Sequence, residues 1–235
     1  MFIGSRQLIA QIPEGTTFTF NGELIKPSKS VKNLGLYMDS YMSFETHINM
    51  MSKKVFGTQS FINRKAATVF NKQTRITIIK TLVLSIINYC STIWGMAGKT
   101  QLSRVQKLQN YAAKVAEGGI RKYDHVTPIL NNLKWLNIEE RVQYDVAVFV
   151  YKVLNNCMPP WLFNFDFLRN VRPTTTRQAN NLVVARTNTN IGGQSFAIKG
   201  PNLWNRIPQE IRGVHNINVF KKKLEIFILE KRITT

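Results

Sequence analysis

The pattern of apolar and polar positions divides the chain into an N-terminal stretch with a period of two and a longer part with helical spacing. Residues 17–20 alternate between threonine and phenylalanine, and Asn21-Gly22 separates them from another short apolar run. Asn-Gly between two such runs favours a tight hairpin, because both turn positions require a positive φ. Residues 31–39 are typical of a further strand, in which Gly35 predicts a bulge or a close backbone approach. The first forty residues are therefore predicted to be strands.

From residue 43 onward, apolar residues recur in steps of three or four, as on one face of a helix. Ser43 is a suitable N-cap for the first helical segment. Asn137 and Glu140 have the spacing of a capping box and predict the start of another. The predicted helices are one that begins at Ser43 and four that cover residues 71–94, 100–116, 137–156 and 219–231.

These elements predict an α+β fold that is mainly α. A small antiparallel hairpin or sheet occupies residues 1–42, and a helical bundle occupies residues 43–120. Residues 121–235 form a mixed helical and extended basic region. Within it, residues 167–208 show no helical period, and residues 182–185 are a candidate strand.

Positive charge is the dominant feature of the composition. Lys and Arg number 32 against 13 Asp and Glu, which gives a formal net charge of +19. Residues 46–116 contain eleven cations and no acid, and residues 167–209 contain six cations and no acid. Solubilising surfaces ordinarily mix the two signs, so these tracts favour a polyanionic partner whose phosphates bind with release of counterions. The alternative is a cationic protein whose charge only keeps it soluble.

The cations of the two tracts are therefore candidate nucleic-acid-binding residues. In the first tract, cations lie opposite the apolar stripe of the helix over residues 100–116. In the second, no acid nearby in the sequence could pair with the arginines, which favours phosphate contacts. Trp94, Trp135 and Trp204 are assigned to the core instead. The predicted contacts are Lys53, Lys54, Arg64, Lys65, Lys72, Arg75, Arg104, Lys107, Lys114, Arg172, Arg177, Arg186 and Arg206.

The carboxylates give no sign of a catalytic centre. Nucleotidyl transfer with two metal ions needs clustered carboxylates, whereas no two of the four aspartates are adjacent or closely spaced. The adjacent Glu139 and Glu140 are explained by capping of a helix that begins at Asn137. Histidines and cysteines lack the spacing of zinc ligands. The sequence thus predicts no catalytic residue, metal site or cofactor within this chain.

The cysteines and the lengths of the apolar runs indicate the cellular compartment in which the protein is expected. Cys90 and Cys157 lie in apolar helical patterns, so both are expected to be buried free thiols of a protein in a reducing environment. Met1 leads directly into a strand-like run, so no secretory signal is expected. The longest apolar run, residues 81–94, is too short for a membrane span. We therefore expect an intracellular protein that is not secreted and has no membrane partner.

Several motifs follow one another in an order that resembles a known family. Residues 33–39 (Asn-Leu-Gly-Leu-Tyr-Met-Asp) and 42–48 (Met-Ser-Phe-Glu-Thr-His-Ile) are similar to an LGxxxD…LSFxxHI stretch. Further matches are residues 1–7, 82–95, 102–110 (similar to LxxxQxxQNRAAR, with Tyr111 where arginine is usual), 133–136 with Arg141 (LxWLxxxxR), 176–177 and 196–208. Together they resemble the reverse transcriptases of jockey-type and chicken-repeat-type LINE elements, which are non-LTR retrotransposons.

The resemblance implies the C-terminal part of an RNA-directed DNA polymerase. Residues 1–42 would be the end of the palm, residues 43–120 a thumb-like domain, and residues 121–235 the C-terminal region. Leu34, Gly35 and Leu36 resemble the primer-grip hairpin, where Gly35 would let the backbone approach nucleic acid. The family's Tyr-x-Asp-Asp motif is absent, so no catalytic residue carries over.

The same resemblance implies partners and a compartment. The partners would be RNA and DNA as template and primer, together with upstream palm, fingers and endonuclease. Mg²⁺ and dNTPs would serve the full-length enzyme, and the location would be the nucleus or cytoplasm. Three alternatives stay open: a domesticated, non-enzymatic nucleic-acid-binding protein, an inert relic of a truncated element, and a helical module that binds an acidic protein.

Overall fold

The structure is a computed structural model that describes residues 1–118, 124–159, 161, 165–171 and 178–233; for residues 65–68, 190 and 233 it describes the backbone alone. Helices make up most of these residues, and two small antiparallel sheets lie near the N-terminus. The predicted class, α+β and mainly α, is confirmed.

The chain divides into two compact units. Unit 1 comprises Met1–Cys90 and Met96–Ile129, and unit 2 comprises Ser91–Gly95 and Leu130–Thr235. The chain therefore enters unit 2 for five residues, returns to unit 1, and crosses again within α7 (Thr127–Leu133).

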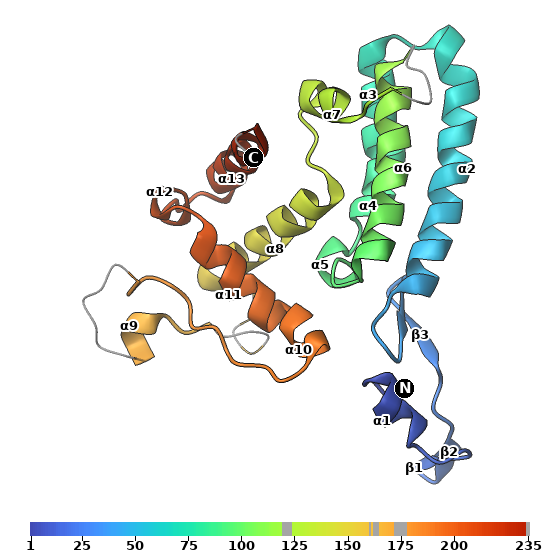
Figure 1. Cartoon of the computed structure of the whole chain (residues 1–235), viewed down its shortest axis with the longest axis vertical. Coiled ribbons are helices and arrows are strands. Elements are labelled where there is room, and N and C mark those ends of the chain that lie inside the picture. The colour runs from blue at the N-terminus through green and yellow to red at the C-terminus, as the bar shows by residue number, and fades with distance from the viewer. Residues whose placement is uncertain (119–123, 160, 162–164, 172–177, 234–235) are drawn as a thin grey trace. The chain divides into compact units, whose positions relative to one another are not determined.

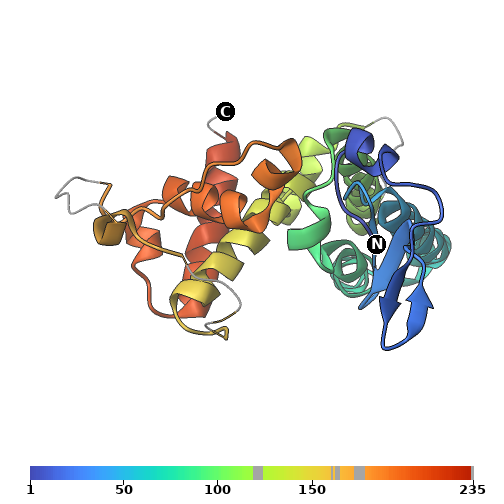
Figure 2. The same ribbon diagram turned by 90° about the horizontal axis from the view of Figure 1, so that it is seen from below.

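The first hairpin of unit 1 forms as predicted. Strands β1 (Phe18–Phe20) and β2 (Glu23–Ile25) are antiparallel and belong to the N-terminal strands drawn as blue arrows in Figure 2. Asn21 and Gly22 in the turn between them have φ values of 50° and 83°. Both strands are exposed along their whole length. The expectation that all of the first forty residues are strands was wrong at α1 (Arg6–Ala10), where the side chain of Ser5 accepts a hydrogen bond from the N–H of Leu8 and caps a short helix.

A second hairpin leads into the helices of unit 1. Strands β3 (Ser30–Asn33) and β4 (Leu36–Asp39) are antiparallel. The carboxylate of Asp39 then accepts hydrogen bonds from the backbone N–H groups of Tyr41, Ser43 and Phe44 and from the Ser43 hydroxyl. This carboxylate therefore organises the turn before α2 (Glu45–Val69), whose start near Ser43 was predicted.

Three helical segments of unit 1 pack side by side (Figure 1). They are α2, α6 (Lys99–Glu117), and α3 (Lys72–Ile79), which continues through a π-helical turn (Lys80–Leu84) into α4 (Ser85–Asn88). Their apolar stripes supply the core, where Val55, Ile79, Val83, Ile87 and Val105 are fully buried. The helix α6 ends at a glycine, Gly118, which has a φ of 79°.

The prediction of one continuous helix over residues 71–94 was wrong. Tyr89 has extended ψ and Cys90 has a φ of 52°, so the helix stops at Asn88 and α5 (Ser91–Trp94) begins afresh in unit 2. The burial expected of the two cysteines was also wrong. Both are free thiols, but Cys90 is partly exposed and Cys157 is exposed.

Unit 2 is built around α8 (Ile138–Leu154), which begins with the predicted capping box of Asn137 and Glu140. Two of its neighbours are α11 (Phe196–Arg206) and α13 (Ile217–Ile233), and the shorter helices are α5, α9 (Leu168–Val171), α10 (Asn190–Gln194) and α12 (Gln209–Arg212) (Figure 1). The predicted helix over residues 219–231 is confirmed as part of α13.

The core of unit 2 is aromatic at its centre. The ring of Tyr151 stacks on that of Phe220 with 4.3 Å between centroids, and Trp204 lies beside the same phenylalanine. Trp94 and Trp135 are buried too, so the assignment of these tryptophans to the core is confirmed. On the facing surfaces of α11 and α8, a Cβ placed on Gly200 would lie 3.0 Å from Cγ2 of Val150. The glycine therefore permits close packing of the two helices.

The absence of helices expected over residues 167–208 was wrong. Residues 196–206 form α11 with Pro201 inside it, and α9 and α10 precede it in the chain. The candidate strand over residues 182–185 is reduced to one isolated bridge between Phe167 and Leu182.

Candidate nucleic-acid interface

The three residues that resemble a primer grip lie at the tip of the second hairpin. Asn33 pairs with Leu36, so Leu34 and Gly35 form a two-residue turn, with φ values of 47° and 85°. The bulge predicted at Gly35 is therefore a hairpin turn instead, and leucine occupies its first position at a steric cost. Leu34 is 84% exposed, whereas Leu36 is buried. The turn thus projects its backbone and one apolar side chain from the unit.

A hydrogen bond from a distant part of the chain fixes this turn. The hydroxyl of Tyr89, just after α4, donates to the carbonyl of Leu34 over 2.6 Å. The Tyr89 ring also borders Gly35, where an added Cβ would lie 3.8 Å from Cε1. The hairpin tip is therefore held against the end of α4.

A pocket of about 590 Å³ lies beside the hairpin within unit 1. The hairpin contributes one wall, and α2 and the end of α4 contribute the others. The lining combines two lysines, two tyrosines, a histidine and apolar side chains: Lys32, Leu34, Gly35, Tyr37, His47, Met50, Met51, Lys54, Ser85, Ile86 and Tyr89. The pocket carries cations but no carboxylate among these residues, which suits an anionic ligand with flat rings.

His47 is the buried polar group of this pocket. It is 7% exposed, and its Nε2 atom has no hydrogen-bond partner among the described residues. Burial lowers the pKa of the imidazole, so the neutral ring is favoured at neutral pH. A buried polar atom without a partner is costly, and a ligand that hydrogen-bonds to Nε2 would remove this cost.

Backbone strain concentrates around the same pocket. Among the described non-glycine residues with a positive φ, Leu34 and Cys90 flank the Tyr89 contact, and Met42 and Phe44 lie in the turn before His47. The π-helical turn ends at Leu84, directly before the pocket residue Ser85. Such strain and π-turns recur at ligand sites, where the surrounding structure holds them in place.

The burial of His47 predicts that stability depends on pH. Because its pKa is lowered in the folded state, the unfolded chain binds the proton first as the pH falls below the ordinary value of 6.5. We therefore expect the free energy of unfolding to decrease between pH 7 and pH 5. Urea titrations at both pH values should show a smaller decrease for His47→Gln. Equal decreases in the two proteins would contradict this role of His47.

Several predicted phosphate contacts are exposed in unit 1. Lys53, Lys54 and Arg64 project from α2, and Lys107 projects from α6. Lys54 also lines the pocket together with Lys32, a residue that the sequence did not single out. The predicted Lys65 has a side chain outside the described residues, and Lys114 is partly buried on α6.

Other predicted contacts are engaged in the structure of unit 1. Arg75 donates to the backbone carbonyls of Phe70, Ala116 and Glu117, and thereby caps the C-terminus of α6. Lys72 forms an ion pair of 2.5 Å with Glu117. The guanidinium group of Arg104 donates to side chains at Asn49 and Gln101. These three residues therefore serve the packing of α2, α3 and α6.

The predicted contacts of unit 2 are not brought to one place by the described structure. Arg186 is exposed on an extended segment, and Arg206 is exposed at the last turn of α11, where it lines a second pocket. Arg172 and Arg177 lie outside the described residues.

The described residues lack both a membrane-spanning helix and a metal-binding group. They contain no helix with both the length and the apolar character needed to cross a bilayer. They also contain no group of three or more His, Cys, Asp or Glu side chains arranged to hold a metal ion.

Comparison of this chain with protein-family models, with curated proteins and with solved structures found no match.

Proposed function

We propose that this chain is the C-terminal part of a non-LTR retrotransposon reverse transcriptase and binds an RNA/DNA template–primer through unit 1. The observation that carries the proposal is the pocket beside Leu34 and Gly35, which is lined by Lys32, Lys54 and buried His47. The Nε2 atom of His47 has no hydrogen-bond partner among the described residues. Lysines can contact the phosphates, tyrosine rings can stack on bases, and the imidazole can accept or donate one hydrogen bond. The motif resemblance places the primer grip at the same hairpin.

The residues present do not fit the Mg²⁺ site that the resemblance implies for the full-length enzyme. Asp39 is engaged by the turn before α2, and Asp145 accepts from Arg141 and from the hydroxyl of Ser91. We therefore propose that this chain by itself grips nucleic acid and does not polymerise. A primer-extension assay with Mg²⁺ and dNTPs that yields product would contradict this part of the proposal.

The exposed apolar surface of the first hairpin also suits a protein partner that would cover it. Phe18, Phe20 and Leu24 are 51%, 65% and 73% exposed, and β1 and β2 each leave one edge unpaired among the described strands. In a larger polymerase, palm residues would cover such a surface. In an inert relic it would be left open, and the protein would aggregate on expression.

The test is binding of the purified protein to an RNA/DNA primer–template across a salt series. We expect the affinity to fall steeply as the salt concentration rises. A plot of the logarithm of the binding constant against the logarithm of the salt concentration should be steeper by about 0.9 for each phosphate contacted. The variant Lys32→Gln/Lys53→Gln/Lys54→Gln should flatten the slope by about 3 if each lysine meets one phosphate. The matched control, Lys134→Gln/Lys222→Gln/Lys223→Gln, removes the same charge from exposed positions outside the two basic tracts and outside the pocket.

Two results would overturn the proposal. One is the absence of binding at low salt by a protein whose circular dichroism shows folded helices. The other is an equal loss of affinity in the two triple variants, which would indicate attraction to net charge alone. Binding that does not change with salt would favour an acidic protein partner in place of nucleic acid.

A further inference from the structure

The side of α2 that faces away from the core of unit 1 carries two aromatic rings in contact with solvent. Val55, Gln59 and Ile62 are buried on the opposite side of this helix. Phe56 and Phe61 lie outside that buried side, and each of them is 61% exposed. Single exposed apolar residues are common on protein surfaces, so the two rings gain meaning only from the residues around them.

A narrow strip of α2 runs between the two rings. Its members are separated by four, three and four residues, which places them close to one line along a helix: Lys53, Gly57, Ser60 and Arg64. At 1.5 Å per residue, this outer strip of α2 is about 16 Å long. At 3.6 residues per turn, the rings project about 70° to either side of it. The outer strip is therefore flanked by one aromatic ring on each side.

The middle of the outer strip has room for a ligand. A Cβ placed on Gly57 would meet no atom within 4 Å outside the adjoining residues and the backbone of its own helix. No close packing within the protein therefore requires glycine at this position, although glycine destabilises the interior of a helix relative to alanine. A chain of phosphates that lies on the outer strip would occupy the space left by the missing side chain.

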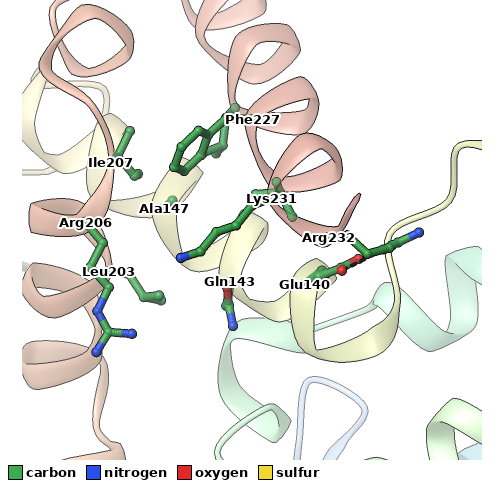
Figure 3. Close-up of a pocket in the computed structure, with 11 residues that line it drawn as sticks. Glu140, Gln143, Ala147, Leu203, Arg206, Ile207, Phe227, Lys231 and Arg232 are labelled. Carbon is green, nitrogen blue, oxygen red and sulfur yellow. Dashed lines mark hydrogen bonds and ion pairs between the residues drawn. The ribbon is translucent and has the colours of Figure 1, made fainter. Parts of the chain in front are cut away.

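The charge of the outer strip is positive and is not neutralised by the protein. Lys53 and Arg64 are exposed at its two ends, and neither forms an ion pair among the described residues. Arg232 of unit 2 gives the contrast, because its guanidinium group pairs with Glu140 (Figure 3). Residues 46–116 also contain no acid. The complementary ligand of the outer strip is therefore a polyanion that also offers flat rings.

We propose that the outer strip of α2 binds a single strand of nucleic acid, with its bases stacked on Phe56 and Phe61. The phosphates lie at Lys53 and Arg64, and the bases turn to the two sides. The rings are about 7.5 Å apart along the helix axis, whereas successive bases of a duplex strand are about 3.4 Å apart. The bases must therefore separate from each other, which a single strand permits. The inference rests on the proposed function, because it assumes that nucleic acid is the ligand.

The experiment compares an oligothymidylate of about 12 nucleotides with a strand of the same length and charge that has no bases. Fluorescence anisotropy with the full chain should show that the oligothymidylate binds at least about tenfold tighter, because only its bases can stack. Phe56→Leu/Phe61→Leu keeps apolar side chains but removes both rings. It should weaken oligothymidylate binding about tenfold or more and leave the abasic strand unchanged. Arg64→Gln should weaken the binding of both strands by the same factor.

The matched control is Phe18→Leu/Phe20→Leu, which alters two phenylalanines of the first hairpin that are 51% and 65% exposed. It should bind both strands as the unaltered protein does. An equal loss in the two double variants would overturn the proposal, and so would an abasic strand that binds as tightly as the oligothymidylate. Absence of oligothymidylate binding would also overturn it and would favour a protein partner that covers Phe56 and Phe61. Circular dichroism shows whether each variant is folded, and the two single variants replace the pair if it is not.

Failure of this inference and failure of the proposed function are distinguishable. A blunt-ended RNA/DNA hybrid has no unpaired bases, so Phe56→Leu/Phe61→Leu should bind it as the unaltered protein does. Lys32→Gln/Lys53→Gln/Lys54→Gln should lose affinity for it. If that loss occurs but the oligothymidylate binds no better than the abasic strand, the stacking proposal alone is wrong. If the oligothymidylate shows the expected difference but no hybrid binds, the reverse transcriptase assignment is wrong and the site on α2 stands.

Discussion

Replacing Arg232 with methionine is expected to lower the free energy of unfolding by about 3–5 kcal/mol, because Glu140 would keep its charge in a buried position without the counter-charge of Arg232. The side chains of Arg232 and Glu140 are only 13% and 14% exposed. Arg232 also donates to the carbonyl of Trp135 and to the side chain of Asn131, so one residue connects α13 to both α7 and the start of α8. Urea denaturation should show a lower midpoint with an unchanged slope.

Two further variants isolate the ion pair. Lys72→Met breaks an ion pair of unit 1 whose lysine is 53% exposed, and pairs of that kind contribute about 0–1 kcal/mol. Adding Glu140→Gln to Arg232→Met should restore part of the lost stability, because the amide needs no counter-charge and can still accept from Asn137. A loss in Arg232→Met no larger than that in Lys72→Met would show that the buried pair contributes little.

Replacing Asp39 with alanine is the second change with a large expected effect. Its carboxylate accepts three backbone N–H groups and one hydroxyl in the turn before α2, and Met42 and Phe44 of that turn have positive φ. Loss of a cap and of further hydrogen bonds to a charged group should lower the free energy of unfolding by about 2–4 kcal/mol. Asp39→Asn keeps one acceptor oxygen and should lose roughly half as much.

The effect of Asp39→Ala can also be measured as a change in primer–template affinity. His47 lies in the first turn of α2, so a displaced turn moves the imidazole away from the pocket and primer–template affinity should fall with stability. Glu14→Ala removes an equal charge at an exposed position and should change stability by less than about 0.5 kcal/mol. Equal stability of Asp39→Ala and Glu14→Ala would show that the turn does not depend on this carboxylate.

The elements that the sequence predicts correctly carry their own local signals. Asn21-Gly22 can adopt the two positive φ values that a tight turn demands, and Gly118 can end α6 in the same way. The capping box at Asn137 closes through hydrogen bonds between residues three apart. In each case the determining interaction lies within a few residues, so it is visible in the sequence.

The errors occur where distant residues decide the conformation. No glycine or proline marks the end of α4 at Asn88, and Cys90 has its positive φ where the chain passes from unit 1 to unit 2. Gly200 and Pro201 are helix breakers by propensity, yet they lie inside α11, where Gly200 allows close contact with Val150. Packing between helices compensates for the local preference, and a single sequence does not display that packing.

The candidate interface was predictable only in part. The hairpin tip and the exposed lysines of α2 could be named from motif and charge. The hydrogen bonds of Arg75 to the end of α6 could not be predicted, because the two acceptors there are carbonyl groups about forty residues away. The spacing of the histidines does not single out His47, whose importance follows from its burial and from an Nε2 atom without a hydrogen-bond partner among the described residues.

The chain passes between the two units three times, and this limits how the protein can be dissected. A fragment that ends at Ile129 would carry α5 without α8, so buried Trp94 and the close contact of Gly95 with Val142 would lose their partners. A fragment that begins at Leu130 would lack Ser91, whose hydroxyl donates to Asp145. Separate expression of the two halves should therefore yield poorly folded protein. Swapping unit 2 between related chains would require residues 91–95 to be exchanged together with it.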